Sequence, residues 1–167
     1  MDLTAFRAEK DSFFAHHHQS PLTYEQKRSF HGLFYFPENR SLNLEVQVQR
    51  LAEPVEVQIP TSKGTVQNYR RYGKFQFQVD GQMAELTIYK GPQGFFLPFV
   101  DSLAGKETYP AGRYLEIESL GKERFLVDFN LSYNPFCAYN EQWSCPLTPQ
   151  ENRLTVPIRA GEKIFPH

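Results

Sequence analysis

The sequence predicts a mainly β protein: an antiparallel sandwich or partly closed barrel of about nine short strands, with one or two N-terminal helices. Two observations predict it. Apolar residues alternate with polar ones along many short runs after about residue 40, which is the spacing of strands with one buried face. Turn residues separate these runs at intervals of roughly ten residues, as they do in sandwiches and barrels.

A chain of 167 residues is expected to form a single domain, residues 1–167. Within it we expect a helical N-terminal segment, residues 1–31, followed by a β-domain, residues 40–167. A domain of this size buries about 70% of the surface that its unfolded chain exposes. It therefore needs neither a metal nor a disulfide to form a core.

Two helices are predicted in the N-terminal segment. Thr4 can cap the first, which covers about residues 4–16 and ends before Ser20-Pro21, because a residue that precedes proline is pushed out of the helical region. Its apolar positions at helical spacing are Phe6, Phe13, Phe14 and His17. Thr23 and Gln26 have the spacing of a capping box and predict a second, short helix.

The strands follow from period-two alternation. A two-residue Asp80-Gly81 loop between alternating runs predicts a hairpin. The predicted strands cover about residues 42–48, 55–59, 65–72, 75–79, 84–88, 95–100, 113–118, 124–129 and 154–158. The stretch 132–150 is rich in proline and asparagine, and we expect it to be a loop within the domain, because flexible linkers rarely contain Trp, Tyr, Phe and Cys together.

Composition disfavours several classes of function. The formal net charge is -1 and no large basic cluster exists, so nucleic acid is not an expected partner. No apolar run approaches the roughly 20 residues that span a bilayer, and the N-terminus lacks the pattern of a signal peptide. We therefore expect a cytoplasmic protein without membrane contact. No metal site is expected, because three consecutive histidines on a helix, His16 to His18, diverge by about 200°.

A set of ordered motifs runs along the chain: Lys10–Phe14, Ser20–Leu22, Phe30–Leu33, Gly105–Tyr114, Asp128–Asn130, Tyr133–Pro135, Cys137–Asn140, Cys145-Pro146, Glu151–Leu154 and Ala160–Lys163. Together these motifs resemble the bacterial domain-of-unknown-function family 1684. The resemblance covers essentially the whole chain. It implies no activity, substrate or cofactor, because that family has none established.

Polar residues gather in the C-terminal loops. Asp128 ends an apolar run, and a carboxylate at the edge of a core must be paired or hydrogen-bonded, so we expect it to pair with Arg113 or Arg124. Each asparagine alone most simply satisfies nearby backbone. Together with aromatic rings they could line a polar pocket; the residues are Asn130, Asn134, Tyr139, Asn140, Trp143 and Asn152. Glu162 is either a tie for the chain end or a pocket carboxylate.

The two cysteines allow several interpretations. Free thiols are the leading one, because disulfides are rare in a reducing compartment, and buried thiols are ordinarily inert. A disulfide between Cys137 and Cys145 and a metal site shared with His31 are the others. A nucleophilic Cys137 would need a nearby cation or histidine to lower its pKa, and Asp128 or His31 would then support it.

The leading functional prediction is a small polar or anionic ligand in a pocket formed by residues 105–113, 128–140 and 145–152. Arg113 would orient the ligand, assisted by Asp128. One alternative is an enzyme or redox protein that uses Cys137. Another is a structural or protein-interaction module whose loops only brace the fold. The cofactor is unknown; a flavin rests on analogy with other β-barrels alone.

Overall fold

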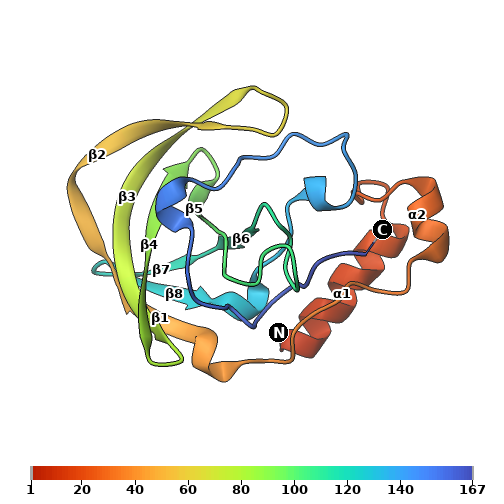
Figure 1. Ribbon diagram of the computed structural model, residues 1–167, viewed down its shortest axis with the longest axis horizontal. Helices are drawn as coiled ribbons and strands as arrows, with labels where there is room; N and C mark the ends of the chain where they lie inside the picture. Colours follow the sequence, from red (N-terminus) through yellow and green to blue (C-terminus); the bar gives the residue numbers. More distant parts are fainter. Residues whose placement is uncertain (1, 167) are drawn as a thin grey trace.

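The computed structural model describes residues 2–166. The predicted mainly β, sandwich-like fold is confirmed: eight strands form two antiparallel sheets that share one core and, within residues 2–166, do not close into a barrel (Figure 1). The sheet orders are β2-β3-β4-β5-β6 and β1-β8-β7. The bounds are β1 Asn43–Gln47, β2 Gln49–Pro60, β3 Val66–Val79, β4 Gln82–Gly91, β5 Gly94–Phe99, β6 Arg113–Glu116, β7 Glu118–Gly121 and β8 Arg124–Asp128.

Alternating residues of both sheets form the core. Leu86 and Ile88 of β4 are fully buried, and so is Val127 of β8. Glu85, which precedes Leu86, is exposed, and Thr87 and Asp128 are partly exposed. Burying one such aliphatic side chain contributes about 1.5–3 kcal/mol, so the period-two pattern both forms the strands and holds the two sheets together.

The predicted hairpin between β3 and β4 is confirmed. Val79 pairs with Gln82, and the two loop residues have positive φ angles, 51° at Asp80 and 80° at Gly81. Residues in these conformations turn the chain with a twist that matches the strands. Asp and Gly adopt them more readily than other residues do.

The structure differs from the predicted strands in three places. The runs 65–72 and 75–79 form one strand, β3, which has a register shift at Gly73, where a Cβ would lie 2.7 Å from the carbonyl oxygen of Gln49. Strand β7 was not predicted, because all four of its residues are exposed and show no alternation. Residues 154–158 form no strand, although Val156 and Ile158 are buried.

The two predicted helices are confirmed as α1, Leu3–His16, and α2, Tyr24–Ser29. Asp2, rather than Thr4, caps α1 by accepting a 2.7 Å hydrogen bond from the backbone N–H of Ala5. The capping box of Thr23 and Gln26 caps α2 as expected. Only one residue of α1, Phe14, is buried.

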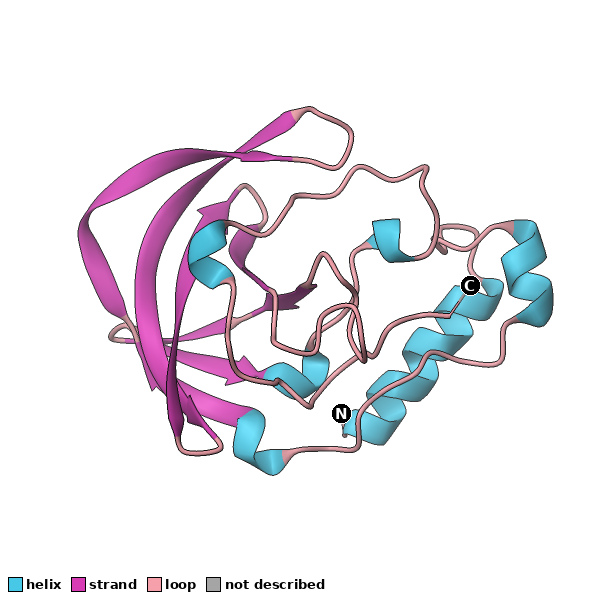
Figure 2. Ribbon diagram, viewed as in Figure 1, coloured by secondary structure: helices cyan, strands magenta, loops and turns pink. Residues whose placement is uncertain are grey.

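The C-terminal segment, residues 129–166, forms isolated β-bridges but no β-strand among its described residues. It contains three 3-10 turns: η2 Phe129–Leu131, η3 Phe136–Ala138 and η4 Gln150–Asn152. A fourth such turn, η1 Arg40–Leu42, precedes β1. Figure 2 shows much of the segment as loop between the sheets and the helices. The residues predicted to form a site lie mostly in this segment.

Candidate functional site

Arg113 joins β6 to the end of the C-terminal segment. Its side chain is 1% exposed. Nη1 donates to the carbonyl oxygens of Ala160 (2.5 Å) and Glu162 (3.0 Å), and Nη2 donates to that of Ile158 (2.9 Å). Nη2 also lies 3.7 Å from a carboxylate oxygen of Asp101. Burial lowers the pKa of Arg113 to about 10, so the guanidinium remains charged at neutral pH.

The predicted pairing of Asp128 with Arg113 or Arg124 is wrong. Arg124 of β8 pairs with Glu45 of β1, which lies two residues from its register partner Gln47. Asp128 instead caps η2: its Oδ1 accepts from the backbone N–H (3.0 Å) and the side-chain Nδ2 (2.9 Å) of Asn130. The physical reason is local, because a short carboxylate satisfies the free N–H groups two residues ahead more readily than it reaches a distant cation.

Two predicted carboxamides bind the backbone of other segments in the way that a strand would. Asn130 accepts from the N–H of Asn39 (2.8 Å) and donates to its carbonyl oxygen (2.9 Å). Asn152, which is fully buried, accepts from the N–H of Thr87 and donates to the carbonyl oxygens of Thr87 and Pro98, each at 2.8 Å. Asn152 thus fixes η4 to β4 and β5.

Glu162 is the centre of a buried polar cluster that connects α1 to the C-terminal segment. It is 2% exposed. One carboxylate oxygen accepts from the N–H of Asn134 and the hydroxyl of Tyr139, each at 3.0 Å, and the other pairs with Lys10 of α1. Burial, and then the nearby Glu162 charge, raises the pKa of Tyr139 well above its usual value.

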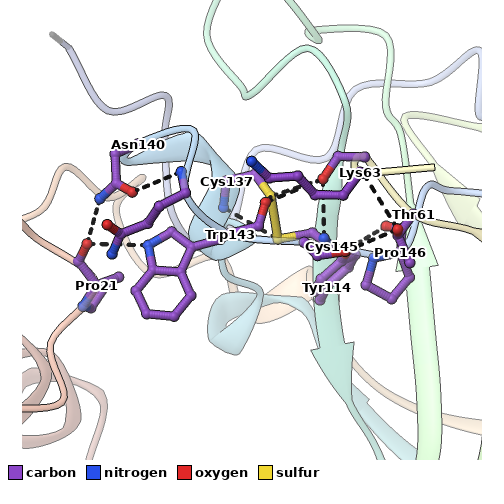
Figure 3. The surroundings of a disulfide bond; sticks show 12 residues. Pro21, Thr61, Lys63, Tyr114, Cys137, Asn140, Trp143, Cys145 and Pro146 are labelled. Atoms are coloured by element: carbon purple, nitrogen blue, oxygen red, sulfur yellow. Dashed lines mark hydrogen bonds between the residues drawn. A yellow bond between two sulfur atoms is a disulfide. The ribbon is translucent and has the colours of Figure 1, made fainter. Parts of the chain in front are cut away.

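Cys137 and Cys145 form a disulfide with a Cα–Cα distance of 6.3 Å (Figure 3). The leading interpretation of two free thiols is therefore wrong, and the disulfide that the sequence left open is present. The reason is that the loop returns on itself and brings both Cα atoms within bridging range. A separation of eight residues does not reveal that geometry.

The same loop is fastened to the connection between the two helices. Asn140 Nδ2 and Trp143 Nε1 both donate to the carbonyl oxygen of Pro21, at 2.6 and 3.3 Å (Figure 3). The disulfide holds the base of this loop. The indole and carboxamide therefore help to position the N-terminal helices relative to the C-terminal segment.

The eight predicted ligand-binding residues thus fall in several places. Arg113, Asn134 and Tyr139 converge on residues 158–163. The pairs Asp128–Asn130 and Asn140–Trp143 lie elsewhere, and so does Asn152. Each of the eight side chains hydrogen-bonds to other parts of the chain.

An open cleft lies beside these residues, between α1 and the sheet. It has a volume of about 620 Å³, which is within the usual range of small-molecule sites. We call it the α1 cleft. Its lining is Phe6, Glu9, Lys10, Phe13, Phe14, Leu115, Glu116, Leu131, Tyr133 and Phe136. Phe13 and Phe136 are each 37% exposed, so large apolar groups remain open to solvent there.

Polar contacts fix the helix that forms one wall of the α1 cleft. Lys10 pairs with Glu162, and Asp11 accepts from the N–H of Leu33 and the hydroxyl of Tyr35, each at 3.0 Å. Arg7 stacks on Tyr35 with its Cζ 4.5 Å from the ring centroid. These contacts hold α1 in place while two of its three phenylalanines, Phe6 and Phe13, are left incompletely buried.

Sequence reasoning missed most residues of the α1 cleft; of its lining, Leu131, Tyr133 and Phe136 lie in the predicted pocket loop, residues 128–140. Phe6 and Phe13 were expected to pack against the core with Phe14. One signal was available: adjacent residues of a helix differ by about 100° in direction, so Phe13 and Phe14 cannot both face the same core. Glu116 gave no signal, because a polar residue at the end of a strand is common.

Among residues 2–166 no three His, Cys, Asp or Glu side chains are placed to hold a metal ion. Neither described helix has the length and apolar content that crossing a membrane requires. Cys137 has no titrating thiol in the disulfide form.

Comparison with known proteins places the chain in a family. The family described as "Protein of unknown function (DUF1684)" matches residues 28–163. The chain belongs to this family. A solved relative, the solution NMR structure of an uncharacterized protein from Haloarcula marismortui, is 36% identical, with a TM-score of 0.73 over 96% of this chain and 91% of that one. No curated protein matches. The DUF1684 membership expected from the motifs is thus shown, and it carries no established activity.

Proposed function

We propose that this DUF1684 protein binds a small molecule in the α1 cleft. The observation that carries the proposal is the cleft itself, a hollow of about 620 Å³ between α1 and β6 that is lined mostly by aromatic and aliphatic side chains. Ligand sites in proteins are typically concave and apolar, with a few polar groups that fix orientation. Here Glu9, Lys10 and Glu116 are those polar groups.

The residues first predicted to bind a ligand support this proposal indirectly. Asn134 and Tyr139 hold Glu162, and Glu162 holds Lys10, which lines the cleft. This chain of contacts sets the position of α1 and therefore the width of the opening. A buried hydrogen-bonded network of this kind makes a site rigid. We therefore assign the backbone N–H of Asn134 and the hydroxyl of Tyr139 to positioning the wall rather than to contacting the ligand.

The test uses Nile red, an uncharged dye that fluoresces in apolar surroundings. We expect saturable binding to the intact protein and perturbation of the Leu115 and Leu131 methyl signals in NMR spectra. Phe13→Ser should raise the dissociation constant at least about 5-fold, because a lost ring contact is worth roughly 1–2 kcal/mol. Tyr24→Ser is the matched control: Tyr24 is an exposed helical aromatic, 78% exposed, outside the cleft lining.

Equal dye binding by the Phe13→Ser variant and the parent, without methyl perturbation, would contradict the proposal. It would favour the alternative that the loops serve only to brace the fold. The other alternative, catalysis by Cys137, requires reduction of the disulfide first, because a disulfide sulfur is not a nucleophile. Turnover that appears only after reduction, with labelling of Cys137, would support it.

A further inference from the structure

The charges around the α1 cleft are unequally neutralised. Lys10 is the cation of the lining, and it pairs with the buried carboxylate of Glu162. The two carboxylates of the lining, Glu9 and Glu116, are exposed. Neither forms an ion pair with a Lys or Arg of residues 2–166. The cleft therefore presents a net negative charge at neutral pH.

Glu116 also lies between two aromatic hollows. Its carboxylate accepts a 2.5 Å hydrogen bond from the hydroxyl of Tyr133. Both residues line the α1 cleft and a second cavity of about 390 Å³, whose walls include the rings of Tyr69, Phe96 and Tyr114. A carboxylate beside aromatic faces is the arrangement that proteins use to bind organic cations.

The aromatic wall already accepts a cation within the protein. The Nζ of Lys10 lies 4.8 Å from the centroid of the Tyr133 ring and 5.9 Å from that of Phe14. An anionic ligand would have to displace Glu162 from Lys10 and would also approach two carboxylates. A cationic ligand needs no such displacement.

We infer that the ligand of the α1 cleft is an amphipathic cation: an amine or quaternary ammonium attached to an apolar or aromatic body. The inference rests on the proposed function. The body would lie against Phe6, Phe13 and Leu131, and the charged head would lie at Glu116, with Glu9 adding to the field at the opening. This reverses the anionic preference first expected from Arg113, whose guanidinium is occupied by carbonyl groups.

The test compares three probes with the same body: 4-phenylbutylamine, 4-phenylbutanol and 4-phenylbutyrate. Each is titrated against the intact protein, and binding is followed by the Leu115 and Leu131 methyl signals. We expect the amine to bind about 10-fold more tightly than the carboxylate, with the alcohol between them. The preference should fall in 0.5 M salt, because exposed charges are screened.

Glu116→Gln should reduce the amine preference to about 3-fold or less while the alcohol binds as before, since glutamine keeps an oxygen for the Tyr133 hydroxyl. Glu118→Gln, an exposed carboxylate on β7 outside both cavities, is the control and should leave the preference intact. Equal binding of all three probes, or tighter binding of the carboxylate, overturns the inference but leaves the cleft as a ligand site. Failure of all three to bind overturns the proposed function as well.

Discussion

The two sheets and the C-terminal segment are held together by different kinds of hydrogen bond. In the sheets, backbone groups pair along regular ladders, as between β3 and β4. Residues 129–166 form isolated bridges and single backbone bonds to other segments rather than ladders, and buried side chains add further bonds to the backbone. Arg113 binds three carbonyl groups of this segment, and Asn152 of the segment binds one N–H and two carbonyl groups of β4 and β5.

This difference indicates where a single substitution should reduce the stability of the fold most. A ladder divides its stability among many bonds, so that losing one side chain costs little beyond its packing. The C-terminal segment concentrates its bonds on a few side chains. Removing one of them leaves several buried groups unpaired, and each unpaired group costs about 1–3 kcal/mol. Polar residues of that segment should therefore be more sensitive to substitution than polar residues of the sheets.

The substitution Arg113→Met is the strongest test of this difference between the sheets and the C-terminal segment. Methionine keeps much of the volume but removes the guanidinium that donates to the carbonyl groups of residues 158, 160 and 162. It also removes the cation beside Asp101, whose carboxylate keeps its hydrogen bonds from Thr108 and Ile158. We expect a loss of about 3–5 kcal/mol in the free energy of unfolding, measured by urea denaturation. Arg124→Met is the control: Arg124 is half-exposed and pairs with Glu45, and an exposed pair is worth about 1 kcal/mol or less. Similar losses in both variants would contradict the comparison.

The dependence of stability on alkaline pH tests the burial of tyrosines in both regions. Burial raises the pKa of Tyr89 and Tyr114 in the sheets and of Tyr139 in the C-terminal segment. Unfolded tyrosines ionise near pH 10, so above that pH the unfolded chain loses protons that the folded chain retains. Stability should then fall as pH rises. Three such tyrosines give a loss of about 3–4 kcal/mol by pH 11.

The measurement is urea denaturation at several values between pH 9 and pH 11, with tyrosine ionisation followed by absorbance. The lowered pKa of Arg113 acts in the opposite direction, since the unfolded chain holds that proton more tightly above about pH 10. Tyr35 and Tyr133, whose pKa values burial also raises, more than offset that contribution. Unchanged stability from pH 9 to pH 11 would be inconsistent with buried phenols.

Sequence predicted the sheets better than the C-terminal segment for the same physical reason. The Asp80-Gly81 hairpin and the alternation of β4 follow from local chemistry, because period two is a property of neighbouring residues. Strand β7 has no such signal, since every residue of it is exposed. The long-range partners of Asn152, residues 87 and 98, have no sequence signature, because a carboxamide can bind any backbone group that the fold brings near it.

The candidate site shows the same limit. Sequence located a polar, aromatic C-terminal region but did not distinguish side chains that brace it from side chains that line an opening. Tyr139 and Asn134 have internal partners, whereas Phe136, three residues from Tyr139, is 37% exposed in the α1 cleft. Which of these neighbours faces inward depends on the 3-10 turn η3, and that turn depends on packing.

Removing the disulfide should cause the smallest loss of stability. It should also show most directly whether the C-terminal segment and the sheets unfold separately. Replacing both cysteines, Cys137→Ser with Cys145→Ser, frees a loop closed by a separation of eight residues, for which loop entropy predicts a loss of about 2.5 kcal/mol. The loss should be local. Trp143, the only tryptophan of the chain, lies in this loop and donates to Pro21, so its emission should shift to the red at a lower urea concentration than the far-ultraviolet circular dichroism of the sheets changes.

Reduction of the parent protein should reproduce that early shift, and the same reductant should leave the double serine variant unchanged. Coincident transitions of Trp143 fluorescence and circular dichroism in the variant would mean that the loop and the sheets unfold as one unit. The C-terminal segment would then be as cooperative as the ladders, and the side-chain bonds of Asn140 and Trp143 to Pro21 would suffice to hold the loop without its covalent link.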